Sequence, residues 1–345
     1  MSAGVPLVTV LTPVFDGEEH LAEALESLRS QTFTDWEGVV IDDGSRDSSA
    51  AIARQFAGAD ARFRVHSQEN RGQPHALNTG LELARGRYVA ILDADDVALP
   101  DRLERQVARL EADPRLGLVG GAVIMIGADG REIGLGEYPL GDPEIRQRLE
   151  GQTAFVHSAA TFRRELAIDS GGYRPATRLA EDLDLWLRLA ERAQLANLPE
   201  PVVRYRMHPG QLSITRIEEQ VMSVQAGLAA ARERRAGRAD PLEGVERLDR
   251  ELLASLGVDD AAIARMAAET ASWWGRVLER AGDDTAAERA WNEARAFARG
   301  PGGGRALEAD ILRERGRAAG ARGRRFSAAL LAARARLLSL GGAPR

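Results

Sequence analysis

The first hundred residues of this chain alternate between short β-rich runs and stretches with helical periodicity. Within the helical stretches, apolar residues recur at the i, i+3, i+4, i+7 spacing of a helix that buries one face. These patterns predict strands over 7–11, 38–41, 63–66 and 88–92, and helices over about 21–28, 48–57 and 74–84. Alternating units of this kind predict an α/β fold in which helices cover a mostly parallel sheet.

Polar residues gather where three of the predicted strands end. They are Thr12-Pro13, the run 42–45 (Asp-Asp-Gly-Ser) and the run 93–96 (Asp-Ala-Asp-Asp). Open α/β sheets bind ligands beyond the carboxyl ends of their strands. The simpler interpretation is that acidic loops cap helices. It fits Asp93 and Asp95 poorly, because two carboxylates beside a buried strand end repel each other unless a cation or donors neutralise them. The run 93–96 therefore favours a site for Mg²⁺ or Mn²⁺ and a diphosphate.

Composition removes several classes of enzyme. All 46 basic residues are arginine, and there is no lysine or cysteine. Walker-A nucleotide sites, protein kinases and Schiff-base enzymes need a lysine, and thiol catalysis needs a cysteine. No Gly-x-Gly-x-x-Gly follows the first predicted strand, which disfavours a dinucleotide dehydrogenase. A diphosphate bound by this chain would have to be neutralised by a metal ion and arginine.

Five segments follow one another in the chain: VTVLTPVFDGEEHLAEALESLRSQTF, VVIDDGSRDSS, ENRGQPHALNTGLELARGRYVAILDADDVALPDRLE, SGGYRPATRLAEDLDLWLRLA and VVRYRMHPGQLS. In this order they resemble the inverting family 2 glycosyltransferases with the GT-A fold, which transfer a sugar from a nucleotide diphosphate sugar. They lie within residues 7–215, about three-fifths of the chain. The resemblance implies a glycosyltransferase of hexosyltransferase type, with UDP-, GDP- or dTDP-linked donors.

The resemblance also implies roles for individual residues. Those expected to contact the nucleotide sugar are Thr12, Pro13, Asp43, Arg71, Asn78, Asp93, Gly172, Glu181 and Arg206. Asp95 is the expected ligand of Mn²⁺ or Mg²⁺. His208 is a second candidate ligand, whereas the other histidines, including His157, are expected to be structural.

The resemblance places a general base at Asp182. Inverting transfer is a single displacement, in which the acceptor hydroxyl loses its proton as it attacks the anomeric carbon. An alternative is that Asp182, with Glu181 and Asp184, only favours the dipole at the start of a helix. The Gly171-Gly172 pair just before it, together with the other motifs, favours the base.

Four regions are predicted along the chain: a catalytic domain over 1–215, a helical accessory region over 216–299, a glycine-rich linker over 300–304 and a basic helical tail over 305–345. Two helical stripes are predicted in the accessory region: Ile263, Met266, Thr270, Trp273 and Val277, and Ala287, Trp291, Ala294 and Ala298. The tryptophans of these stripes are expected in the core between packed helices. The tail holds ten arginines and three acidic residues. Its apolar residues are Phe326, Leu330, Leu331, Leu337, Leu338 and Leu340. Such a helix suits an anionic membrane, and docking on this protein or a partner is an equal alternative.

We expect a cytoplasmic enzyme, with any membrane contact peripheral and at the inner face. The longest apolar run, 116–127, is shorter than the roughly 20 residues of a membrane helix, and no signal peptide is evident. The expected acceptor is a hydroxyl of a glycan, a lipid-linked sugar or a protein. A homo-oligomer is compatible with the sequence, and nucleic acid is not an expected partner. The main alternative function is a catalytically silent GT-A-like scaffold that acts through its helices; a nucleotidyltransferase is less favoured.

Overall fold

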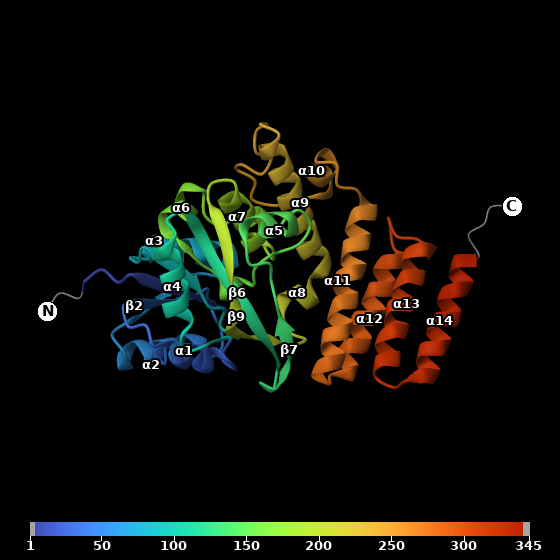
Figure 1. The fold of residues 1–345 in the computed structure, drawn as a ribbon, viewed down its shortest axis with the longest axis horizontal. Coiled ribbons are helices and arrows are strands. Elements are labelled where there is room, and N and C mark those ends of the chain that lie inside the picture. Colours follow the sequence, from blue (N-terminus) through green and yellow to red (C-terminus); the bar gives the residue numbers. More distant parts are fainter. Residues whose placement is uncertain (1–3, 341–345) are drawn as a thin grey trace. The chain divides into compact units, whose positions relative to one another are not determined.

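The computed structural model describes residues 4–340, and of residues 325, 326 and 340 it describes the backbone only (Figure 1). The chain forms two compact units. The first consists of residues up to Ile126, of Gly134–Arg206 and of Ala231–Arg247. The second consists of Gly127–Ile133, of Met207–Ala230 and of residues from Leu248 on. This division differs from the predicted boundary at residue 215, because Ala231–Arg247 returns to the first unit; we call it the return segment.

Four parallel strands form one half of the sheet in the first unit. Their order is β3-β2-β1-β4, and their bounds are Val8–Val14 (β1), Trp36–Asp42 (β2), Phe63–Ser67 (β3) and Tyr88–Ile91 (β4). Every residue of β1 and β2 is buried, as expected for parallel strands covered on both faces. The predicted alternation of strands and helices is therefore confirmed in this region, and the three polar runs lie at the carboxyl ends of β1, β2 and β4.

The other half of the sheet contains antiparallel pairs. The order continues from β4 through β8 (Thr161–Arg163), β6 (Leu116–Gly127) and β9 (Gln194–Met207) to β5 (Val97–Ala98), while β7 (Glu132–Gly136) pairs with β6. β8 runs antiparallel to both β4 and β6. The predicted α/β fold with helices flanking the sheet is confirmed. Because β8 lies beside β4, residues 157–160, which precede it, come close to the run 93–96.

Helices of the first unit pack on the sheet. They are α1 (Leu21–Arg29), α2 (Ser49–Ala59), α3 (Gln73–Leu83), α4 (Arg102–Ala112), α5 (Asp142–Arg148), α6 (Arg164–Asp169) and α7 (Glu181–Ala190). α1 buries Leu21, Ala24, Leu25 and Leu28, the residues whose spacing predicted it. α7 is the most deeply buried of them, and Trp186 at its centre has no exposed surface. A helix buried along its length holds the carboxylates at its N-terminus in fixed positions.

The second unit is mainly helical. Its helices are α8 (Leu212–Thr215), most of α9 (Ile217–Arg235), α10 (Arg250–Ser255), α11 (Asp260–Ala281), α12 (Asp284–Arg299), α13 (Arg305–Ala321) and α14 (Arg325–Leu340). The last four stand side by side in Figure 1, and each packs against the next. Asp283 caps α12, because its carboxylate accepts a hydrogen bond from the Ala286 backbone N–H.

One tryptophan prediction in the second unit is wrong. Trp291 is buried as expected, but Trp273 is 40% exposed and the adjacent Trp274 is buried in its place. Small residues make up more than half of the buried face of α11, and Gly275 lies so close to Trp291 that a Cβ atom there would be 2.7 Å from the indole. The close approach at Gly275 turns this side of α11 towards α12, so the adjacent Trp274 is buried and Trp273 lies outside the buried face.

The predicted tail folds as α13 and α14 and packs within the second unit. Ala309, Leu312 and Ala335 form a small core with Leu331 and Leu338. Arg322 and Arg324 form ion pairs with Asp284 of α12. Docking on the chain itself, one of the two predicted alternatives, is therefore present for α13. The side chains of Phe326 and Leu340, and residues 341–345, lie outside the described part.

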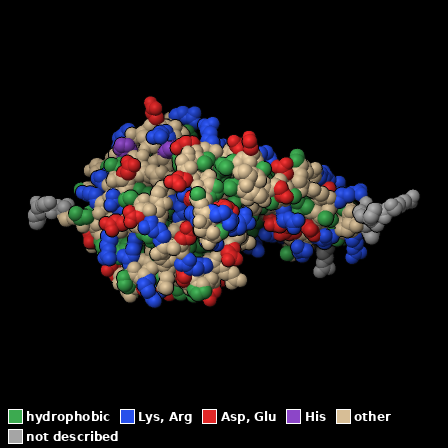
Figure 2. Space-filling model, turned by 90° about the horizontal axis from the view of Figure 1, so that it is seen from above, with side chains coloured by type: hydrophobic (Ala, Val, Ile, Leu, Met, Phe, Trp, Pro, Cys, Tyr) green, Lys and Arg blue, Asp and Glu red, His purple; other side chains and the backbone are tan. Residues whose placement is uncertain are grey.

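The glycine-rich residues 300–304 form a close turn between α12 and α13. The Gly304 backbone N–H donates to the Ala298 carbonyl at 2.8 Å, and a Cβ on Gly302 would meet the Asp260 backbone at 2.2 Å. Between residues 4 and 340, no helix combines the length and apolar character needed to cross a membrane. Figure 2 shows acidic and basic side chains interspersed over the face that it draws, in keeping with the many arginine–carboxylate pairs.

Candidate active site

The loop after β2 is organised by Asp43. Its carboxylate accepts hydrogen bonds from the Gln68 side chain at 2.8 Å and from the backbone N–H groups of Arg71 at 3.1 Å and Gly72 at 2.8 Å. Gly44 adopts a positive φ of 79°, and a Cβ there would lie 2.9 Å from the backbone nitrogen of Asn70. Asp43 thus shapes the loop from which the exposed Arg71 projects. Its expected contact with a nucleotide base stays a prediction.

Thr12 and Pro13 lie at the buried end of β1. The Thr12 hydroxyl oxygen is buried and has no hydrogen-bond partner among the described residues. A buried hydroxyl without a partner is costly unless something else supplies the missing bond. This unsatisfied group at the carboxyl end of a strand is compatible with a ligand contact there.

Asp93, at the end of β4, is held by two residues from the turn before β8. The Ser158 hydroxyl donates to one carboxylate oxygen at 3.0 Å, and the imidazole Nδ1 of His157 lies 3.4 Å from the other. The Ser158 oxygen also accepts the Asp93 backbone N–H. Burial raises the pKa of Asp93, but the His157 charge and the Ser158 hydrogen bond outweigh it and hold that pKa below its usual range.

His157 belongs to this site, although the sequence placed it among the structural histidines. Its Nε2 lies 3.1 Å from the Tyr173 hydroxyl, so both ring nitrogens have polar partners. Burial alone would lower the pKa of His157. The charges of Asp93, Asp182 and Glu181 outweigh burial and raise the pKa to about 9. His157 is therefore a buried imidazolium among carboxylates at neutral pH. A single histidine carries no local motif, and its proximity to Asp93 arises only because β8 pairs with β4.

The carboxylate of Asp96 is fully buried beside Asp93 and Asp95. One of its oxygens accepts the Arg206 backbone N–H at 2.7 Å, and the other has no hydrogen-bond partner among the described residues. Burial, followed by the charges of Asp95 and Asp93, raises the pKa of Asp96 well above its ordinary value. The strand end thus concentrates negative charge that the surrounding side chains neutralise only in part.

The guanidinium of Arg206 lies beneath this run. Its Nε donates to the Asp95 carbonyl at 2.8 Å, and Nη2 contacts Glu23 at 2.6 Å. The Arg206 side chain is only 2% exposed. In this structure Arg206 supports the backbone of the acidic run, and its expected diphosphate contact stays a prediction. His208 belongs to the second unit, where its backbone N–H donates to Gln211, and its expected metal contact also stays a prediction.

The donor set at the end of β4 suits a hard divalent cation shared with a ligand. No three His, Cys, Asp or Glu side chains in the described part of the chain are grouped to hold a metal without further ligands. Mg²⁺ and similar ions are commonly held by one or two carboxylates, with substrate phosphates and water completing the shell. The unpartnered oxygen of Asp96 and the raised pKa of its carboxyl indicate that added positive charge would stabilise this run. The residues therefore fit such an ion.

A second acidic pair opens α7. Glu181 is 4% exposed, and one of its carboxylate oxygens is buried without a hydrogen-bond partner. Burial and the Asp182 charge raise the pKa of Glu181 to about 7. Burial also raises the pKa of Asp182, while the His157 charge partly offsets this effect. Asp182 is thus a more basic carboxylate than usual, within electrostatic reach of His157 and Asp93.

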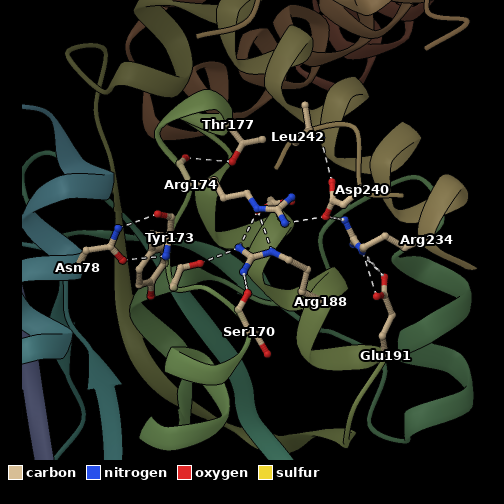
Figure 3. A network of polar contacts seen from close by, with 12 residues as sticks. Asn78, Ser170, Tyr173, Arg174, Thr177, Arg188, Glu191, Arg234, Asp240 and Leu242 are labelled. Atoms are coloured by element: carbon tan, nitrogen blue, oxygen red, sulfur yellow. Dashed lines mark hydrogen bonds and ion pairs between the residues drawn. The ribbon is translucent and has the colours of Figure 1, made fainter. Parts of the chain in front are cut away.

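The loop before α7 is fixed by buried polar contacts, which Figure 3 shows. Arg188 donates to the carbonyls of Ser170 and Gly172 and pairs with Asp184 at 2.7 Å. The Asn78 amide nitrogen donates to the Tyr173 carbonyl at 2.7 Å, and the Asn78 side-chain oxygen accepts the Tyr173 backbone N–H at 2.8 Å. Gly171 and Gly172 have positive φ values of 87° and 63°. Asn78 and Gly172, both expected at the donor site, are therefore brought together in one rigid corner.

The return segment is tied to this corner by ion pairs. Asp240 contacts Arg174 at 2.6 Å and Arg234 at 3.0 Å, and Arg234 also contacts Glu191 at 2.8 Å. Arg174 in turn lies 3.6 Å from Asp184. This contact was not predictable, because Arg174 and Asp240 are 66 positions apart in the sequence and belong to no motif that links them.

The mostly parallel half of the sheet, the acidic run after β4 and the buried acidic start of α7 match the arrangement expected for a GT-A-type glycosyltransferase. The model of the family described as Glycosyl transferase family 2 matches residues 9–171. The amylovoran biosynthesis glycosyltransferase AmsE of Erwinia amylovora is 34% identical over 204 residues, covering 58% of this chain and 76% of AmsE. EpsE of Bacillus subtilis, also named as a glycosyltransferase, is 35% identical over 214 residues, covering 60% of this chain and 74% of EpsE.

A solved structure shares the fold. The mannosyltransferase PcManGT of Pyrobaculum calidifontis, in complex with GDP-Man and Mn²⁺, aligns with a TM-score of 0.52 and 22% identity over 95% of this chain and 87% of its own. The chain belongs to glycosyltransferase family 2, and it is a glycosyltransferase. The resemblance seen in the sequence and the expected enzyme class are thus confirmed.

Proposed function

We propose that this protein is an inverting glycosyltransferase that moves a sugar from a nucleotide diphosphate sugar to an acceptor hydroxyl, with Asp182 as the general base. The observation that carries the proposal is the position of Asp182. It is a carboxylate of raised pKa at the start of a buried helix, within electrostatic reach of His157 and Asp93. A base held in this way can accept a proton at the moment an acceptor oxygen attacks.

The surroundings of Asp182 suit proton transfer at neutral pH. Burial raises the pKa of Asp182, which makes its carboxylate a stronger base than an exposed aspartate. The His157 imidazolium partly opposes this rise. Burial and the charges of Asp182 and Glu181 raise the pKa of Tyr173, so its hydroxyl stays protonated against His157. The proposed base thus combines a raised pKa with a neighbouring positive charge.

The donor is proposed to bind along the carboxyl edge of β1, β2 and β4. Thr12 and Pro13 lie at the end of β1, Asp43 and Asp93 follow β2 and β4, and Arg71, Asn78 and Gly172 come from the loops and helix beside them. Glu181 adds a carboxyl group beside the proposed base. A chain without lysine has only arginine and metal to neutralise a diphosphate, which supports the roles proposed for Arg71 and Arg206.

A divalent cation is part of the proposal. Asp95, with Asp93 and Asp96 beside it, would hold Mn²⁺ or Mg²⁺ together with the donor phosphates, and His208 is a further candidate ligand. Such an ion neutralises the charge that develops on a departing diphosphate. The Mn²⁺ in the complex of PcManGT supports this proposal.

Substitution of the base tests the proposal. Asp182→Asn should lower transfer by about 10²- to 10⁴-fold, because proton removal loses its acceptor. Binding of UDP, GDP or dTDP, measured by calorimetry with and without Mn²⁺, should identify the preferred base and stay nearly unchanged in the variant. Retained turnover in Asp182→Asn would refute the assignment. Failure to use any donor in a panel of nucleotide sugars would favour the scaffold alternative.

Peripheral contact with the inner face of a membrane belongs to the same proposal. Leu330 and Leu337 of α14 are 62% and 71% exposed, and Arg334 and Arg336 are exposed on the same helix. An exposed apolar and basic helix favours anionic lipid. Anionic liposomes should sediment the full chain better than Leu330→Glu/Leu337→Glu, and equal sedimentation would refute this contact. A glycan or lipid-linked acceptor would fit such a location.

A further inference from the structure

A cavity of about 660 Å³ opens in the first unit beside the corner that holds Gly171 and Gly172. Its lining comes from three parts of the chain: α3 contributes His75 and Asn78, the loop after α6 contributes residues 169–171 and 173–175, and the return segment contributes Asp240 and residues 242–246. The volume lies in the range of pockets that bind small ligands. The return segment forms one complete wall of this cavity.

The cavity adjoins the proposed catalytic groups. Tyr173 lines it, and the hydroxyl of the same residue contacts His157 at 3.1 Å. Asn78 lines it as well, and its amide holds the Tyr173 backbone. A ligand in the cavity would therefore lie against residues that directly contact the candidate active site. The donor motifs at Thr12, Asp43 and Asp93 are not among the lining residues.

The wall formed by the return segment is built before any ligand arrives. Asp240 is anchored by Arg174 and Arg234, and Leu242 is 1% exposed. Arg234 is fixed further by Glu191. Charged side chains held by several partners at once lose little freedom when a ligand binds, so the cavity is preorganised.

The charges that face the cavity are mainly negative. The three arginines of the anchoring network, Arg174, Arg188 and Arg234, are balanced by three carboxylates, Asp184, Glu191 and Asp240. Outside this network, the lining carries the carboxylates of Asp169, Glu243 and Glu246, with His75 as the remaining titratable group. Carboxylates accept hydrogen bonds from sugar hydroxyls and repel anions.

We propose that this cavity binds the acceptor glycan and admits a glycan segment that carries no negative charge, either neutral or amino-bearing. The proposal rests on the glycosyltransferase function proposed above. It assigns the choice of acceptor to Glu243 and Glu246 of the return segment, which lie beyond residues 9–171 that match the family. Of the residues proposed to contact the donor, only Asn78 lines the cavity, so donor binding and acceptor choice meet at Asn78 and are otherwise carried by separate parts of the first unit.

The first experiment tests whether the cavity is the acceptor site. The chain has no cysteine, so Val245→Cys gives a single thiol on the cavity wall. On an array of neutral, amino-bearing and uronate oligosaccharides, the full-length variant should bind the neutral and amino-bearing ones, and labelling with N-benzylmaleimide should abolish that binding. Unlabelled Val245→Cys is the matched control. Binding of nucleoside diphosphate by the labelled protein should change by less than about twofold, because Val245 lies on the return segment and only Asn78 of the proposed donor residues lines the cavity.

The second experiment tests the charge selection. The wild-type chain should bind neutral and amino-bearing oligosaccharides at least about tenfold more tightly than uronates of equal length. In Glu243→Gln/Glu246→Gln this ratio should fall to about threefold or less. Glu82→Gln/Glu165→Gln, two exposed glutamates outside the lining, is the matched control and should keep the wild-type ratio.

Three outcomes would overturn the proposal: uronates as the tightest ligands, glycan binding that survives the maleimide label, or no binding of any neutral or amino-bearing glycan. Loss of selectivity in the control pair would also contradict it. Failure of the proposed function would look different, because the chain would then bind no nucleoside diphosphate and use no donor while its glycan selectivity could still be measured.

Discussion

A buried histidine within reach of several carboxylates acts as a fixed positive charge, and His157 is such a residue. Its contacts with Asp93 and Tyr173, and a pKa raised to about 9, keep it protonated across the neutral range. The charge stabilises the ionised forms of Asp93 and Asp182. His157 is therefore placed to decide at which pH the proposed base becomes active.

His157→Gln should reduce transfer at neutral pH by roughly tenfold and move the acidic limb of kcat/KM to higher pH. The sign follows from the charge: without the imidazolium, burial raises the pKa of Asp182 unopposed, so the base ionises later as pH rises. A pH profile of kcat/KM provides the measurement. His66→Gln, at an exposed position on β3, is the control. An unchanged profile in His157→Gln would contradict this role.

Glu181 should make the fold less stable as pH rises. Its folded pKa of about 7 lies above the ordinary value of 4.5, because its ionised form is buried. Stability is therefore lost between pH 4.5 and about 7 and stays lost above that range. Glu181→Gln removes this titration. The gain in the free energy of unfolding over the wild type should therefore be up to about 3 kcal/mol larger at about pH 8.5 than at about pH 5. Urea denaturation at both pH values measures the difference, and an equal gain at both would refute the assignment.

Individual site residues were predictable where they follow a strand or sit in a family motif. Asp43, Asp93 and Asp182 occupy the positions that these patterns indicate. His157 and Ser158 were not predictable, because their role depends on the pairing of β8 with β4, which joins residues about 65 positions apart. Local sequence carries no record of such a contact.

Among the elements, the link from α3 to the loop before α7 depends on one glycine. A Cβ on Gly172 would lie 2.6 Å from the Asn78 side-chain oxygen, which already accepts the Tyr173 N–H. On Gly171, a Cβ would meet nothing closer than 3.9 Å, although φ is positive at both positions. A side chain at either glycine would meet backbone strain, but only a side chain at Gly172 would also overlap a neighbouring atom.

Gly172→Ala should destabilise the fold by about 2 kcal/mol more than Gly171→Ala, because it displaces the Asn78 amide from its hydrogen bonds. Asn78→Ala removes the overlap, so the difference between the two glycine variants should nearly vanish in that background. Guanidinium denaturation of the single and double variants forms the cycle. Equal costs of the two glycine substitutions in the presence of Asn78 would show that the overlap has no effect.

The helical elements were predictable as elements but not in how they face each other. Helical spacing placed α11 and α12 correctly, and Asp283 marked the start of α12. The choice of stripe on α11 favoured large side chains, whereas close packing against Trp291 requires Gly275 and alanines. Periodicity defines a helix, but which of two neighbouring stripes is buried depends on the shape of its partner.

At the scale of the whole molecule, the catalytic unit is not continuous in sequence. The chain leaves the first unit at Arg206 and comes back with the return segment, Ala231–Arg247. The predicted catalytic domain, residues 1–215, lacks this segment because the family motifs end before it. The family motifs contain the residues proposed for the donor site. The return segment, in contrast, is held by ion pairs whose partners lie far apart in sequence.

A chain ended after residue 215 should therefore be less stable than one ended after residue 247, by at least about 3 kcal/mol. It loses buried Leu242 and leaves Arg174 without Asp240 beside the buried Asp184–Arg188 pair. Thermal unfolding of the two chains measures the difference, and the full chain serves as the reference. The shorter chain should keep most of its nucleoside diphosphate affinity at low temperature, because every residue proposed to contact the donor or the metal lies at or before residue 208, yet it should lose transfer to any glycan. Equal unfolding temperatures would show that the return segment does not stabilise the first unit.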